Sequence, residues 1–120
     1  MTLSLVIINY LGGEVFNEET KRKIRKFRDD REWSQFHTPA NLAKVISIEA
    51  GELLEHFLWN DNYDKKEVCE ELADVIIYCL HMADSLGVGI EDIINRNMDK
   101  NDKKYPVEKS KGTSEKYTKL

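Results

Sequence analysis

The sequence predicts an all-α protein, and three features of the chain point to this fold class. Apolar residues recur at the spacing of a helix face through most of the 120 residues. Residues that favour helix starts, namely Asn17, Thr38 and Asp64, stand before three of these periodic segments. Hydrophobic residues make up 41% and charged residues 33% of the chain, which suits a single globular domain and argues against disorder.

The first two predicted helices begin at capping residues. Asn17 caps a helix over about residues 18–32, which is rich in arginine and lysine. Thr38 caps the second helix, with Pro39 in its first turn, and this helix is expected to run to about Trp59. The segment WSQFHTPAN, which joins the two helices, is expected to be a loop.

Two further helices complete a predicted four-helix bundle. Asp64 opens the third helix, with Glu67 as its capping-box partner, and Gly87 ends it. The fourth runs from about residue 90 to residue 101, and Pro106 prevents its continuation. The chain is therefore expected to consist of an irregular N-terminal arm (1–16), a helical domain (17–105) and an irregular C-terminal tail (106–120).

Charge and cysteine content restrict the classes of function. A net charge of −4 gives no general attraction to nucleic acid or to a membrane, although the basic residues from Arg22 to Arg31 leave an oligonucleotide binder as an alternative. Cys69 and Cys79 lie about 15 Å apart along one predicted helix, too far for a disulfide. Reduced thiols and an N-terminus without signal-peptide features predict a cytoplasmic protein.

Two pairs of carboxylates interrupt apolar helix faces. Glu49 and Glu52 fall within the apolar face of the second predicted helix, and Glu71 and Asp74 within that of the third. Each pair has i,i+3 spacing, so its members project from one side of a helix. The midpoint of each pair lies about eleven residues from the turn near Asp61, which is about 16 Å along a helix. Because a short turn makes the two helices antiparallel neighbours, all four carboxylates are expected to converge.

A cation is the expected partner of this acidic cluster. No lysine or arginine stands three or four residues from any of the four carboxylates, which argues against the alternative of surface ion pairs. Clustered carboxylates repel one another and resist desolvation unless a cation compensates them. An all-oxygen ligand set selects a hard ion such as Mg²⁺ or Mn²⁺, whereas a di-iron bundle uses Glu-x-x-His motifs. Such a site suggests phosphate chemistry on a nucleotide.

The same residues resemble a known family. The segments EAGELLEHFLW and EELADVIIYCL are similar to the E-x-x-E and E-x-x-D motifs of the all-α NTP pyrophosphatases, the MazG-like superfamily. The segments REWSQFHTPANL, MDKNDKKYP and SEKYTKL resemble, in the same order, its dCTP pyrophosphatase branch. The resemblance spans about residues 17–120. It implies a Mg²⁺-dependent hydrolase that cleaves a nucleoside triphosphate between the α and β phosphorus atoms and releases a monophosphate and pyrophosphate.

The resemblance also implies roles for individual residues. Glu49, Glu52, Glu71 and Asp74 would hold the metal, and Glu49 or Glu52 would activate the attacking water. The resemblance implies that four rings hold the base, namely Trp33, Trp59, Tyr78 and His37. It implies further substrate contacts at and just after the end of the fourth predicted helix, namely Lys100, Asn101, Lys104 and Tyr105.

Two observations leave alternatives open at these positions. Core packing is the structural alternative for Trp33 and Trp59. Asn97 stands where relatives in this branch have a lysine, so the triphosphate contacts there depend on Lys100 or Arg96.

Members of the family assemble as oligomers, which implies a homotetramer, with a dimer as the second choice. Two functional alternatives to a dCTP pyrophosphatase also remain. One is a dNTP pyrophosphatase of broad specificity. The other is a non-catalytic helical interaction module whose carboxylates bind a structural metal.

Overall fold

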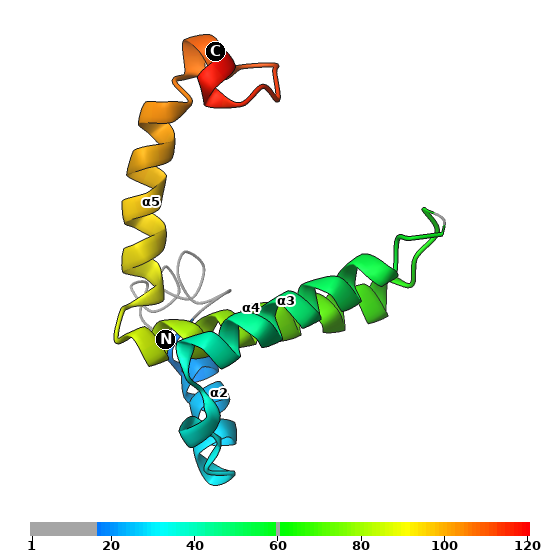
Figure 1. The fold of residues 1–120 in the computed structure, drawn as a ribbon, viewed down its shortest axis with the longest axis vertical. Helices are drawn as coiled ribbons and strands as arrows, with labels where there is room; N and C mark the ends of the chain where they lie inside the picture. The colour runs from blue at the N-terminus through cyan, green and yellow to red at the C-terminus, as the bar shows by residue number, and fades with distance from the viewer. Residues whose placement is uncertain (1–16, 60) are drawn as a thin grey trace, which may run out of the picture. The chain divides into compact units, whose positions relative to one another are not determined.

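The computed structural model describes residues 17–59 and 61–120, and the secondary structure recorded there is helical (Figure 1). The arm predicted over residues 1–16 lies outside the described residues. The longer helices are α2 (Glu18–Asp30), α3 (Pro39–Glu55), α4 (Lys65–Leu86) and α5 (Ile90–Lys104). The shorter ones are η1 (Trp33–Phe36), α6 (Val107–Ser110) and η2 (Tyr117–Lys119). The predicted all-α fold class is confirmed.

The predicted helix starts are confirmed by their capping hydrogen bonds. The side chain of Asn17 accepts a hydrogen bond from the Thr20 backbone N–H at 2.7 Å. The Thr38 hydroxyl accepts one from the Asn41 N–H at 3.2 Å, and Asp64 accepts one from the N–H two residues further on at 2.9 Å. Each bond satisfies a backbone donor that the first turn of a helix would otherwise leave unpaired.

The ends of α3 and α5 differ from the prediction. α3 ends at Glu55 and not near Trp59, because the N–H groups of Phe57 and Leu58 bond to carbonyls three residues back and tighten the chain into a turn. α5 continues past residue 101 to Lys104. The long apolar pattern before Trp59 therefore includes residues that are no longer helical.

The loop and the tail contain more structure than expected. The segment predicted as a loop includes the 3₁₀ helix η1, which follows Glu32 in the left-handed region at φ 55°. The tail, predicted to be irregular, forms α6 and η2. Pro106 ends α5 as predicted, and its fixed φ then serves as the entry to α6.

α3 and α4 lie side by side and antiparallel, joined by the turn after α3 (Figure 1). α2 contacts η1 and α4. The side chains fully buried in this part of the described chain are few, with Leu42, Leu80 and Ala83 as the apolar ones. The chain divides into two compact units after Leu86. Gly87, at φ 68°, ends α4, and α5 belongs to the second unit, so the packing of α5 in one four-helix bundle stays a prediction.

A group of ion pairs fastens α2 to α4. Arg25 donates two hydrogen bonds to Asp84, at 3.0 and 2.9 Å, and Arg28 donates another at 2.8 Å. Burial alone would raise the pKa of Asp84, but the bonds from the two guanidinium groups outweigh it and hold this pKa below its ordinary value. Asp84 thus stays ionised and links α4 to two arginines of α2.

No single helix in the described ranges is both long and apolar enough to cross a membrane, and α4 with α5 meet that test only as a bent pair.

We expect Asp84→Asn to lower the free energy of unfolding by about 1–3 kcal/mol, because two charged donors lose their acceptor. Asp30→Asn is the matched control, since Asp30 pairs with Lys26 on the exposed side of α2, and it should cost no more than about 0.5 kcal/mol. Urea unfolding, monitored by circular dichroism, measures the free energy of unfolding of both variants and of the wild type. Equal small losses would show that the link between α2 and α4 adds no stability.

Candidate metal centre and adjoining aromatic cavity

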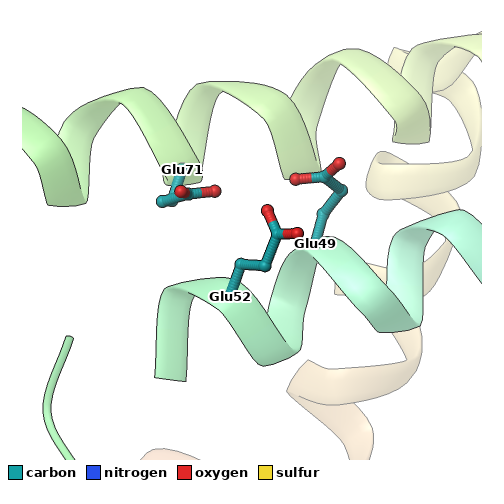
Figure 2. Close-up of side chains that lie close together, drawn as sticks. All are labelled: Glu49, Glu52 and Glu71. Carbon is teal, nitrogen blue, oxygen red and sulfur yellow. The ribbon is translucent and has the colours of Figure 1, made fainter. Parts of the chain in front are cut away.

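Three carboxylates meet in the space between α3 and α4. Glu49 and Glu52 project from α3 toward α4, and Glu71 projects from α4 (Figure 2). One oxygen atom of each carboxylate lies within 4.8 Å of the oxygen atoms of the other two. The convergence predicted from the equal distances to the turn is therefore found for three of the four acidic residues.

These carboxylates lack compensating partners. The Oε2 atoms of Glu49 and Glu71 are buried without a hydrogen-bond partner. Burial and then the charge of Glu52 raise the pKa of both groups above its ordinary value, and the charge of Asp74 adds to this. The ion pairs that lysine and arginine form in the described part of the chain involve other carboxylates. His56 comes nearest, with Nε2 3.9 Å from Glu71 Oε1.

The arrangement fits a hard divalent cation. All of its donors are carboxylate oxygens, and two of them are buried with nothing to bond. A cation would supply the missing partner and would remove the mutual repulsion that raises the pKa values. Mg²⁺ and Mn²⁺ both prefer such oxygen ligands.

Asp74, the fourth predicted ligand, lies beside the cluster and outside the group of three. It stands one turn beyond Glu71 on α4 and is exposed. Its shorter side chain reaches less far across the gap between the helices than a glutamate would. Its charge nevertheless raises the pKa of Glu49, Glu71 and Tyr78, which places it close to them. Its role as a ligand stays a prediction.

A cavity with aromatic walls adjoins the acidic cluster. It consists of two hollows that share Trp33, His37 and Tyr78. The larger, of about 420 Å³, lies among α2, η1 and α4 and includes Asp74 in its wall. The smaller, of about 300 Å³, is bounded by η1, α3 and α4. These volumes are in the range of small-molecule sites, and Asp74 and Tyr78 connect the cavity with the metal centre.

The rings in this cavity are held by one another. Trp33 contacts Phe27 edge to face, with ring centroids 5.7 Å apart. The His37 ring lies 4.7 Å from that of His81, which in turn lies 6.0 Å from the ring of Tyr78. Three residues predicted to hold a base, Trp33, His37 and Tyr78, are therefore brought together. Flat rings of this kind can stack on a base.

Trp59 lies beyond the end of α3. The second helix was expected to run to about Trp59, but α3 ends at Glu55. Its side chain is 90% exposed, and it is absent from the walls of both hollows. A contact between Trp59 and a base stays a prediction.

The other predicted substrate contacts lie in the second unit. Lys100, Asn101 and Lys104 belong to α5, and Tyr105 caps its end. Within this unit the Lys104 ammonium lies 5.0 Å from the ring centroid of Tyr117, and Tyr105 contacts the same ring at 6.0 Å. Their roles toward a substrate stay predictions.

His81 was missed by the sequence reasoning. It is 5% exposed and forms part of the wall of the larger hollow. The signal was present in the spacing, because Asp74, Tyr78 and His81 stand at i, i+4 and i+7 and so share one face of α4.

Comparison with known proteins identifies relatives of this chain. A model of the MazG-like family matches residues 44–120. Proteins named dCTP pyrophosphatase 1 from Mus musculus and Rattus norvegicus are 34% and 36% identical over 113 residues. In both comparisons the match covers 86% of this chain and 66% of the relative, so the chain spans just under two thirds of their length. The corresponding human protein is 33% identical.

A solved structure is also similar. A pyrophosphatase from Archaeoglobus fulgidus aligns with a TM-score of 0.68 and 41% sequence identity. The match covers 78% of this chain and 99% of that protein. At this identity the likeness concerns sequence as well as fold.

We expect Glu52→Gln to leave the metal-free protein as stable as the wild type or up to about 1 kcal/mol more stable, because it removes one of the mutually repelling charges. The rise in melting temperature that MgCl₂ causes in the wild type should be largely lost. Glu55→Gln, on the exposed side of α3, is the matched control and should keep that rise. The measurement is the melting temperature of each variant in EDTA and in MgCl₂. A full Mg²⁺ effect in Glu52→Gln would contradict the assignment of the metal centre.

Proposed function

The chain belongs to the MazG-like family, and on that premise we propose that it is a nucleoside triphosphate pyrophosphatase that acts on dCTP or a modified dCTP. The observation that supports this most directly is the acidic cluster with unpartnered oxygens beside an aromatic cavity. A hydrolase of this kind needs a cation near the phosphates and a hollow for the base, and the two features adjoin here. The names of the relatives support the cytosine base.

Glu49, Glu52 and Glu71 would hold the divalent metal, with Asp74 at the edge toward the cavity. When bound, Mg²⁺ supplies charge neutralisation at the phosphates and lowers the pKa of a coordinated water. The absence of nearby lysine and arginine partners among the described residues keeps these carboxylates available for that purpose.

Glu49 or Glu52 would accept a proton from the attacking water. The water oxygen forms a bond to the α phosphorus, and the bond from that phosphorus to the oxygen bridging to the β phosphorus breaks. The products are a monophosphate and pyrophosphate.

Trp33 and Tyr78 would hold the base by stacking, worth about 1–3 kcal/mol per ring, and His37 would complete the wall. Binding in this hollow brings the phosphates past Asp74 to the acidic cluster, because Asp74 belongs to the wall of the cavity and lies near Glu49. Lys100 and Lys104, with Asn101 and Tyr105, are proposed contacts from the second unit.

Two other functions remain as alternatives. A dNTP pyrophosphatase of broad specificity would use the same cluster and a cavity that accepts several bases. A non-catalytic helical interaction module would use the cluster for a structural metal only. The cavity of about 420 Å³ that adjoins the carboxylates favours an enzyme, because a purely structural metal needs no adjoining space for a substrate.

We further propose that the protein is a homotetramer, with a dimer as the second choice, and that it is cytoplasmic. The small number of fully buried apolar side chains in the described part of the chain supports assembly. Large apolar side chains are exposed on α3 and just after it, namely Ile48, Leu54, Phe57 and Leu58. Both cysteines are free thiols, as suits a reducing compartment.

Incubation with Mg²⁺ and each of dCTP, dTTP, dATP, dGTP and CTP should give monophosphate and pyrophosphate, and fastest from dCTP. Glu52→Gln should lower kcat by at least about a hundredfold, whereas Glu55→Gln should not change it. Ion-exchange chromatography separates the products. Equal turnover of all substrates would favour the broad dNTP pyrophosphatase. Diphosphate and orthophosphate would mean another hydrolase, and no product would favour the interaction module.

Light scattering coupled to size-exclusion chromatography should give about four times the chain mass of 14.0 kDa. Ile48→Lys and Leu54→Lys should shift the protein to smaller species, because a charge in an apolar interface must be desolvated. Glu19→Lys, at an exposed position of α2, is the control for a change of charge away from this apolar surface. A wild-type monomer would contradict the proposed assembly.

A further inference from the structure

Two histidine rings lie together in the wall of the larger hollow. His81, on α4, is 5% exposed, and its ring centroid lies 4.7 Å from that of His37. The two rings are tilted by 43°, and the ring of Tyr78 meets His81 at 6.0 Å. Both histidines belong to the wall of the hollow. His81 has no part in the hydrolysis proposed above.

Each of these rings has an unused polar atom. The Nδ1 atoms of His37 and His81 are buried without a hydrogen-bond partner. Buried polar groups in proteins are nearly always paired, so an unpaired one calls for a ligand or another specific explanation. Two such atoms on neighbouring rings of one cavity point to a ligand that offers complementary hydrogen-bonding groups.

Both rings are neutral at physiological pH. Burial, followed by the nearby His37 and Arg28, lowers the pKa of His81 to about 4, against the opposing effect of Asp84 and Asp29. Burial and Arg28 also lower the pKa of His37. A neutral imidazole offers one N–H donor and one nitrogen acceptor. Such a pair is suited to an uncharged base edge and not to a phosphate, which requires cationic or N–H donors throughout.

We propose that His81 is a specificity-determining residue that, together with His37, hydrogen-bonds the edge of a pyrimidine carrying an amino donor beside a ring-nitrogen acceptor. This inference rests on the proposed function, whose base it assigns to the larger hollow. Each neutral imidazole carries one N–H donor and one nitrogen acceptor, so the histidine pair can present one donor and one acceptor to a ligand. That combination is complementary to the amino group and ring nitrogen of cytosine.

The position of His37 allows a base to reach these atoms. His37 caps the end of η1, a 3₁₀ helix of four residues, and its backbone N–H is bonded to the Ser34 carbonyl at 3.1 Å. His81 is a buried residue of the long helix α4. A base that enters against Trp33 therefore separates the two rings by moving His37, and the freed nitrogen atoms pair with the base.

Binding of dCMP and dTMP in EDTA tests this inference without metal or turnover. Isothermal titration should show that the wild type binds dCMP at least about tenfold more tightly than dTMP. His81→Phe keeps the ring shape but removes both nitrogen atoms, and it should lower this ratio by about tenfold or more. Met82→Leu, a volume-conserving change at the next position of α4, should leave the ratio unchanged. A wild type without preference, or His81→Phe with the wild-type ratio, would overturn the proposal.

A second pair of variants keeps the test valid where His81→Phe does not fold. Asn places its amide near the position of Nδ1, and Gln places its amide near Nε2. His81→Asn should therefore retain more of the dCMP preference than His81→Gln, and equal ratios would count against the role of Nδ1. A purely structural role would weaken dCMP and dTMP binding by the same factor in every variant.

Hydrolysis of dCTP with Mg²⁺ separates this inference from the proposed function. A wild type that prefers dCMP but yields no product would refute the pyrophosphatase and leave the base-reading site. A wild type that hydrolyses dCTP, with a ratio unaffected by His81→Phe, would refute the base-reading site and leave the pyrophosphatase.

Discussion

Repulsion among three carboxylates placed between α3 and α4 is the constraint on which the rest of the structure depends. Glu49, Glu52 and Glu71 occupy positions where an antiparallel helix pair would ordinarily place apolar side chains. Burial raises the pKa of two of them and leaves two oxygen atoms without partners. The helix pair therefore lacks apolar packing where these carboxylates lie, and contacts elsewhere must stabilise it.

Those contacts lie toward the far end of α4. Arg25 and Arg28 reach from α2 to Asp84 near the end of α4, while Leu42 of α3 and Leu80 of α4 are fully buried. The same arrangement holds α2 and η1 against α4 and so creates the hollow between them. Arg28 also lowers the pKa of both histidines in that hollow. The ion pairs that stabilise the unit thus set the electrostatic conditions of the cavity.

The sequence predicts the local features of this arrangement well and the tertiary ones less well. Capping at Asn17, Thr38 and Asp64 depends on side chains within three residues, so it can be read from the chain. The register of the carboxylates follows from helix rise and turn position alone. The end of α3, and with it the position of Trp59, depends on a turn that interrupts a continuous apolar pattern. The spacing of apolar residues alone does not reveal that turn.

His81 is the cavity residue that the sequence did not reveal, because the pattern of a polar residue on a helix face is the same whether that face meets water or a hollow. Asp74, Tyr78 and His81 share one face of α4, yet only the packing of α2 and η1 against that face makes it a cavity wall. The apolar stripe of α5 likewise does not show which surface it packs against, so the sequence alone does not assign α5 to the first or the second compact unit.

The small number of buried apolar side chains and the repulsion in the acidic cluster both lower the stability of the isolated chain. A ligand that binds only the folded state stabilises it in proportion to the logarithm of its concentration over its dissociation constant. A cation at the three glutamates would therefore restore free energy that their repulsion removes, and burial of Ile48 and Leu54 against another subunit would restore more. The isolated, metal-free chain should be its least stable form, because the residues that weaken it are the ones a metal and a partner subunit would cover.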